Sequence, residues 1–160
     1  MMCTHHSVLP MKNSHRSADS LPCACTTVRK ASRSLFRFYE AGLAESDLSV
    51  TQFALLRALE RNGATPLSRL AEELVAERTS LYRMLKPLET AGLVATRDAE
   101  TGRARIAELT ARGRRQLSRA AGLWSATQQK AVERIGAARW AELSQLLLEI
   151  PELLTAEDGR

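Results

Sequence analysis

The stretch Pro66–Ala91, PLSRLAEELVAERTSLYRMLKPLETA, decides the fold predicted for this chain. It holds two runs of helical periodicity, separated by a short segment, Val75-Ala76-Glu77, that has room only for a turn. Apolar residues of the first run recur at the spacing of one helix face: Leu67, Leu70, Ala71 and Leu74. The sequence therefore predicts a helix-turn-helix, with Pro66 at the start of the first helix and Gly92 as the stop of the second.

The second helix has two chemically opposite faces when each residue advances by about 100°. One side is apolar and consists of Leu81, Met84, Leu85 and Leu88. The other side is an arc of about 140° that carries cationic and hydroxyl groups: Arg78, Thr79, Tyr82, Arg83 and Lys86. An apolar face can pack on a core while such a polar face enters a DNA major groove. Pro87 removes one backbone hydrogen bond and is expected to bend the final turn, beyond these residues.

The basic charge of the chain is concentrated around this helix. The formal net charge is +5. Residues 78–115 hold nine Lys or Arg and four acidic residues, while the remainder holds 14 of each kind. A basic excess confined to one stretch favours a polyanion-binding face, with a merely solvated basic surface as the alternative.

Length and composition restrict the class of protein. The 160 residues are 44% hydrophobic and 26% charged, which is ordinary for one folded domain with extensions. No apolar run reaches the roughly 18 residues that a membrane span needs, and no signal peptide is recognisable. Three cysteines without an export signal indicate reduced thiols in the cytoplasm, not a disulfide framework. We expect a cytoplasmic protein without a membrane partner or cofactor.

The N-terminal part is predicted to be a tail followed by two helices. Residues 1–20 show no periodicity and are expected to be flexible, so Cys3, His5 and His6 are not assigned as a metal site. A first helix is predicted over Cys25–Gly42. A second begins with a capping box, Ser49 followed by Gln52, and ends at Asn62-Gly63.

After Gly92 the hydrophobic period changes from that of a helix to that of a strand. Residues 93–97 and 103–109 are predicted to form two short strands joined by residues 98–102. This hairpin carries Arg97, Arg103 and Arg105. A helix-turn-helix followed by a basic hairpin is a winged helix-turn-helix, placed here at about residues 49–109, whose wing can reach the DNA backbone or the minor groove.

Two long helices complete the chain. Thr110 is expected to cap a helix that ends at Gly136, and a last helix is predicted from Ala137 to Ile150, where Pro151 disrupts it. Their apolar faces exceed what a small winged helix can cover. We therefore predict a mainly α fold with a small β-hairpin wing, one domain over residues 21–160, and a dimerisation layer over about 23–43 and 110–154. A two-fold homodimer would place its recognition helices about 34 Å apart, on a pseudopalindromic operator.

Three segments resemble the MarR family of transcriptional regulators. LSRLAEELVAERTSLYRMLKPLETAGLV is similar to the helix-turn-helix of that family, and RDAETGRARIAELTARGR is similar to its wing and the start of the next helix. The order of the flanking helices also agrees, over roughly residues 23–154. The resemblance implies a transcriptional repressor that binds double-stranded DNA. A small aromatic or amphipathic ligand would release the repressor from the DNA. This chain departs from the family at two positions. The family commonly has an acidic residue where Thr101 stands, and it often has Asp where Glu77 stands.

We predict the DNA-contact residues from the helix geometry and from the resemblance together. The resemblance implies a wing contact from Arg103 and base or phosphate contacts from Arg78, Thr79, Ser80 and Arg83. The whole set is Arg78, Thr79, Ser80, Tyr82, Arg83, Lys86, Arg103 and Arg105. Arg78 and Arg83 suit either a bidentate guanine contact or a phosphate clamp. The alternative is a surface salt bridge, such as one from Arg78 to Glu77 or Glu73.

Cys23 and Cys25 open the first predicted helix, where a thiol can acquire a lowered pKa and oxidant sensitivity. A thiol-based switch is therefore an alternative mode of regulation, beside an inert structural role. Four aromatic residues at helical spacing are interpreted as core, not as a ligand site: Phe36, Tyr39, Trp124 and Trp140.

Enzymatic activity is not expected. Histidine occurs only at positions 5, 6 and 15, and no metal-ligand spacing, nucleophile elbow or phosphate-binding glycine loop is present. A winged helix that serves only protein or RNA contacts is a further alternative. Steep salt dependence and sequence preference on duplex DNA would distinguish the regulator from that module.

Overall fold

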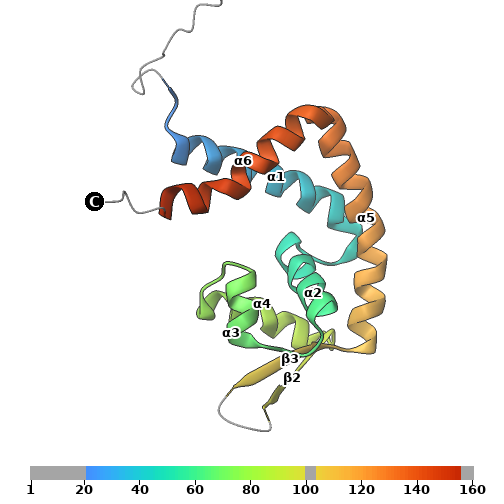
Figure 1. The fold of residues 1–160 in the computed structure, drawn as a ribbon. Coiled ribbons are helices and arrows are strands. Elements are labelled where there is room, and N and C mark those ends of the chain that lie inside the picture. Colours follow the sequence, from blue (N-terminus) through green and yellow to red (C-terminus); the bar gives the residue numbers. More distant parts are fainter. Residues whose placement is uncertain (1–20, 100–103, 156–160) are drawn as a thin grey trace, which may run out of the picture. The chain divides into compact units, whose positions relative to one another are not determined.

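The structure is a computed structural model that describes residues 21–99 and 104–155. The predicted flexible tail, with Cys3, His5 and His6, lies outside these residues. The chain divides into two units between Ser34 and Leu35, inside the first helix. In chain order the elements are α1 Ala24–Leu43, η2 Ala44–Ser46, α2 Val50–Asn62, β1 Thr65–Pro66, α3 Leu67–Glu73, α4 Arg78–Thr90, β2 Val94–Asp98, β3 Arg105–Leu109, α5 Ala111–Ile135 and α6 Ala137–Thr155 (Figure 1).

The winged helix-turn-helix of α2, α3, α4 and the hairpin is present as predicted. Leucines from each of its helices and from α5 fill one core, in which the largest fully buried apolar side chains are Leu43, Leu55, Leu56, Leu59, Leu70, Leu81, Leu85, Leu88 and Leu117. The capping box of α2 is confirmed, because the Ser49 hydroxyl accepts from the Gln52 N–H and the Gln52 side chain accepts from the Ser49 N–H. Gly63 follows the last residue of α2, as expected.

The sheet has one strand more than the sequence predicted. β2 and β3 form the expected antiparallel hairpin, in which Val94 pairs with Leu109 and Asp98 with Arg105. A third strand, β1, joins the other edge of β3 and gives the order β1-β3-β2. Pro66, predicted only as the start of a helix, pairs with Ile106 in this strand and also precedes α3. Proline is tolerated here because β1 is an edge strand.

The exit of α4 follows the predicted pattern closely. Gly92 has a left-handed φ of +66°, and its N–H donates to the carbonyl of Glu89 over 2.9 Å. The N–H of Leu93 donates to the carbonyl of Leu88, also over 2.9 Å. These two bonds are those of a Schellman motif, which turns the chain sharply from the helix into the hairpin.

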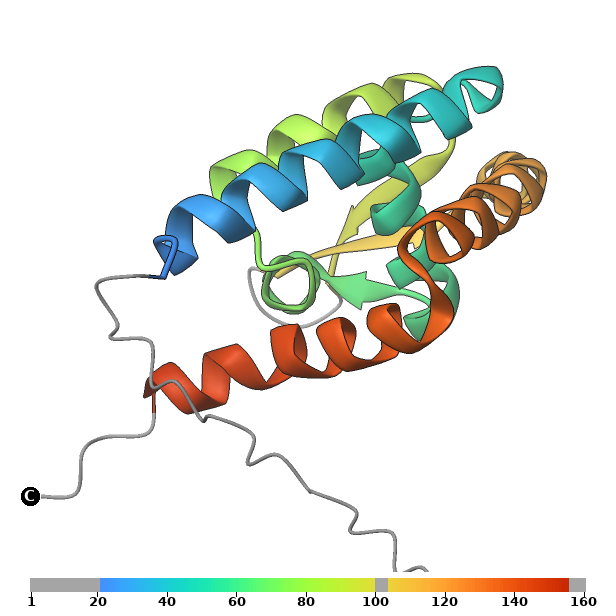
Figure 2. The same cartoon turned by 90° about the horizontal axis from the view of Figure 1, so that it is seen from above.

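α5 and α6 are joined at Gly136, where the chain changes direction and α6 runs at a steep angle to α5 (Figures 1 and 2). The Thr110 hydroxyl accepts from the Gly113 N–H over 3.0 Å, so the predicted cap of α5 is confirmed. The prediction that Pro151 ends α6 is wrong, since the helix continues to Thr155. Pro151 forgoes its own backbone hydrogen bond, but the turn after it keeps its helical path, where the Thr155 hydroxyl donates to the Pro151 carbonyl over 2.8 Å.

Candidate nucleic-acid interface

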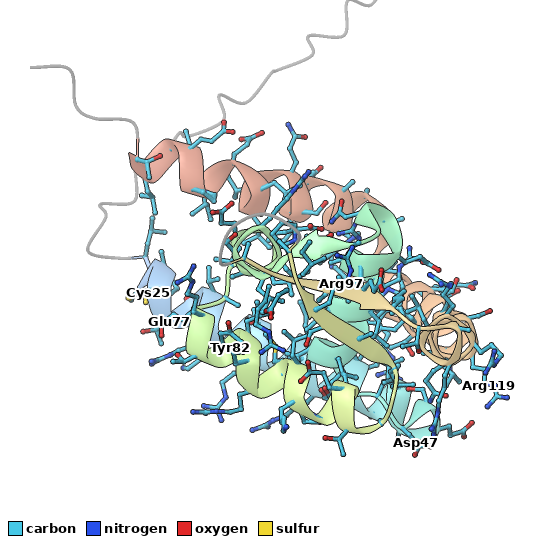
Figure 3. All side chains as sticks on the ribbon, turned by 90° about the horizontal axis from the view of Figure 1, so that it is seen from below. Cys25, Asp47, Glu77, Tyr82, Arg97 and Arg119 are labelled. Carbon is cyan, nitrogen blue, oxygen red and sulfur yellow. The ribbon has the colours of Figure 1, made fainter. Side chains whose placement is uncertain are left out.

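The two faces of α4 are those that the periodicity predicted. Leu81, Leu85 and Leu88 are buried, and Met84 packs partly buried against the core. Every residue predicted to contact DNA from this helix is exposed: Arg78, Thr79, Ser80, Tyr82, Arg83 and Lys86. Figure 3 shows Glu77 at the beginning of α4 and Tyr82 farther along the helix. The core thus holds one side of α4 while the other side presents donors to solvent.

The turn that leads into α4 is unusual. Val75 has a positive φ of 49° and is 95% exposed. A β-branched side chain is disfavoured in this left-handed conformation, so the turn stores backbone strain. At the first turn of α4, the Glu77 side chain makes no capping hydrogen bond, and Glu is in general a weaker N-cap than Asp.

The cations of the α4 face are free to meet a partner. Within residues 21–99 and 104–155, no ion pair involves Arg78, Arg83 or Lys86. The salt bridge considered between Arg78 and Glu73 is not formed, because Glu73 pairs with Arg61 and accepts from Asn62. The pKa of Glu73 is lowered, and the main cause is the hydrogen bond from Arg61.

The hairpin is tied to α4 through the Glu89 carboxylate. Arg105 of β3 approaches Glu89 with an N···O distance of 3.7 Å and donates to the Thr96 hydroxyl. Thr96 in turn donates to Glu89. Sequence reasoning missed this cluster, since it depends on a register that brings Thr96 and Arg105 to one face of the hairpin. Arg97 is exposed, whereas the predicted contact Arg103 and the departure at Thr101 lie outside the described residues.

A cleft of about 300 Å³ with both polar and apolar lining lies between the start of α2 and the exposed face of α4. Its lining comes from both helices: Ser49, Thr51, Gln52, Ser80, Arg83, Met84 and Pro87. The sequence identified Ser49 and Gln52 only as a helix cap. It carried no signal that this cap adjoins Arg83.

An aromatic cluster joins α1, α2 and α5. Trp124 stacks on Phe53 at a centroid distance of 4.7 Å and lies 4.5 Å from the Tyr39 ring. The Tyr39 hydroxyl donates to Gln128, and burial raises the pKa of Tyr39. Tyr39 and Trp124 are therefore packed residues, as predicted. Phe36 is not, because its side chain is 43% exposed.

Cys23 and Cys25 are free and exposed at the start of α1, where Figure 3 labels Cys25. Two hydrogen bonds from Thr26 lower the pKa of Cys23, and the bond from the Thr26 backbone has a larger effect than the bond from its side chain. Elsewhere in the described residues, no cluster of three His, Cys, Asp or Glu suited to a metal ion occurs. Among the helices described, none is long and apolar enough to cross a membrane.

The comparisons with known proteins agree with this geometry. The model of the MarR family matches residues 48–103. The transcriptional regulator MosR of M. tuberculosis, solved in complex with DNA, is 32% identical; the match covers 84% of this chain and 98% of MosR, with a TM-score of 0.75. The transcriptional repressor CouR, solved with p-coumaroyl-CoA, is 25% identical over 81% of this chain and 91% of CouR, with a TM-score of 0.72. No curated protein gives a significant match to the sequence.

A winged helix-turn-helix with an exposed basic recognition helix defines a DNA-binding regulator of transcription. The chain belongs to the MarR family, whose members are transcriptional regulators and not enzymes.

Proposed function

We propose that this protein is a homodimeric repressor that binds a pseudopalindromic operator and releases it when a small ligand binds. The observation that carries the proposal is the exposed polar face of α4, whose cations have no ion-pair partner among the described residues. Residues Arg78, Thr79, Ser80, Tyr82, Arg83 and Lys86 would enter or border the major groove. Arg103 and Arg105 would bring the wing to the backbone or minor groove. Such a regulator acts in the cytoplasm.

The apolar faces that the chain leaves uncovered support the dimer. None of the described side chains of α6 is buried, and five of its six leucines are exposed, with Leu148 at 78% and Leu154 at 81%. Phe36 of α1 is also exposed. Large contiguous apolar surface is uncommon on a monomer and favours association. We infer that segments 23–43 and 110–154 cover each other's apolar faces in a second copy of the chain.

Ligand release rests on a relative. CouR, which is 25% identical to this chain, was solved with p-coumaroyl-CoA bound. We therefore propose that a small aromatic or amphipathic molecule lowers the affinity of this protein for its operator.

A thiol switch is a second candidate mode of regulation. Cys23 and Cys25 are exposed, and the pKa of Cys23 is lowered, which increases the fraction of reactive thiolate. Cysteines two residues apart pair poorly with each other, so a bond between subunits is the form that the switch would take. Peroxide should then weaken operator binding of the wild type but not of the Cys23→Ser, Cys25→Ser double variant.

Selection of bound sequences from random duplex DNA tests the main proposal. We expect an inverted repeat with half-sites about one helical turn apart, and a dimer mass in light scattering. Arg83→Ala should weaken operator binding by about 1–3 kcal/mol. Arg57→Ala is the matched control, because Arg57 is exposed on α2 and pairs with Glu60. A monomer without sequence preference would instead favour a winged-helix module for protein contacts.

A further inference from the structure

The cleft between α2 and α4 brings hydroxyl groups and one guanidinium group together from two separate parts of the sequence. Ser49 and Thr51 come from the start of α2, whereas Ser80 and Arg83 come from the exposed face of α4. Met84 and Pro87 supply apolar wall. The cleft opens beside the same face of α4 that carries the predicted DNA contacts, so a molecule lying along that face passes its mouth.

The polar groups of the cleft differ in how far they are already occupied. Ser49 and Gln52 are committed to the capping box, in which each accepts a backbone N–H. The Thr51 hydroxyl lies 3.0 Å from that of Ser49 and keeps further hydrogen-bonding capacity. Arg83 forms no ion pair within the described part of the chain. Arg83 and Thr51 are therefore the groups most available to a ligand.

The charge of the cleft favours an anion. None of its lining residues is acidic, and Arg83 supplies one permanent positive charge. At this end of α2 the Glu40 carboxylate accepts the Val50 N–H over 2.8 Å. It is engaged with the backbone of Val50 and does not line the cleft.

We propose that this cleft binds one backbone phosphate of duplex DNA in each half-site, with Arg83 and Thr51 as its ligands. The proposal rests on the proposed operator binding and assigns a role within it. Arg83 is then a phosphate clamp and not a reader of guanine, and Thr51 is a contact residue from outside the helix-turn-helix stretch. A guanidinium suits a phosphate bidentately, and a phosphate bound between two helices fixes the register of α4 in the groove.

The test uses the full chain and operator duplexes with single-site changes. One series replaces one phosphate at a time by an uncharged methylphosphonate, and a second replaces one guanine at a time by 7-deazaguanine. Dissociation constants are measured for the wild type, Arg83→Gln, Thr51→Val and the control Arg57→Gln, which changes an exposed arginine of α2 that pairs with Glu60. All three positions are exposed, and matching circular dichroism spectra and melting temperatures establish that the variants fold.

At one phosphate per half-site, we expect the methylphosphonate to weaken DNA binding by the wild type by at least about fivefold. The same replacement should weaken DNA binding by Arg83→Gln by less than about twofold. Binding by Thr51→Val should be less sensitive to that replacement than binding by the wild type. Arg57→Gln should keep the full sensitivity.

Two results would overturn the assignment. One is that Arg83→Gln loses its sensitivity to a 7-deazaguanine instead of a phosphate; the other is that both variants respond to every methylphosphonate as the wild type does. In both cases the wild type still selects its operator, so the proposed function survives. A wild type that selects no sequence would overturn the proposed function, and this inference with it.

Discussion

The Thr110 hydroxyl donates a 2.7 Å hydrogen bond to the carbonyl of Gly92 and thereby joins the start of α5 to the exit of α4. The same hydroxyl accepts from the Gly113 N–H, and the Thr110 N–H donates to Leu93 over 3.1 Å. One residue thus caps the long helix and attaches it to the chain that leaves the recognition helix.

Gly113 permits this junction, and we predict that Gly113→Ala destabilises the protein. A Cβ atom at this position would lie 2.0 Å from the carbonyl oxygen of Leu93, which is backbone and cannot turn aside. The start of α5 would have to shift, at a cost of about 1–3 kcal/mol by analogy with overpacked cores. Chemical denaturation measures the change.

Gly122→Ala is the matched control for that variant. Gly122 lies in the same helix, and a Cβ atom there meets nothing within 4 Å. Because alanine is the better helix former, this change should stabilise the protein by up to about 1 kcal/mol. Equal effects from the two substitutions would refute the close approach at Gly113.

We predict that Val75→Asn raises the melting temperature. Val75 is held at a φ of 49°, a conformation that asparagine tolerates and a β-branched residue does not. The free energy of unfolding should rise by about 1 kcal/mol, because the Val75 side chain lies almost entirely in solvent and its replacement loses no packing. Val75→Ala, which removes both γ-methyl groups but adds no polar group, should give a smaller gain. A lower melting temperature for Val75→Asn would show that the turn is not strained.

Glu73 should contribute to the acid sensitivity of the fold. Its pKa is lowered from 4.5, chiefly by the hydrogen bond from Arg61. A lowered pKa means that the contribution is complete above the unfolded-state value and is lost as the pH falls through the lower folded-state value. Melting temperatures measured between neutral pH and strongly acidic pH should therefore fall less in Glu73→Gln than in the wild type. Parallel curves would contradict this.

The Glu89–Arg105 pair predicts a distinguishable role for the wing. If Arg105 contacts a phosphate, Arg105→Ala lowers the slope of log affinity against log salt by about one, whereas Glu89→Gln leaves the slope unchanged. The stability of the free protein should change little, by about 0–1 kcal/mol, because Arg105 is 44% exposed. An unchanged slope in Arg105→Ala would limit that residue to bracing the hairpin against α4.

The periodic parts of the chain were predictable because each follows from local physical chemistry. The leucine spacing of α3 and α4, the capping box at Ser49 and the left-handed stop at Gly92 depend on residues within a few positions of one another. The third strand was not predictable. Thr65-Pro66 is too short to show a period, and its pairing partner lies some forty residues farther along the chain.

The same division holds for the candidate site. The sequence by itself determined which face of α4 is polar, because a helix repeats at a fixed angle and its leucines must be buried. It did not determine what lies beside that face. Only the tertiary structure placed Thr51 and Arg83 in one cleft and tied Arg105 to Glu89, because packing between separate elements decides which residues meet. Local pattern fixed the recognition helix, and long-range packing fixed its neighbours.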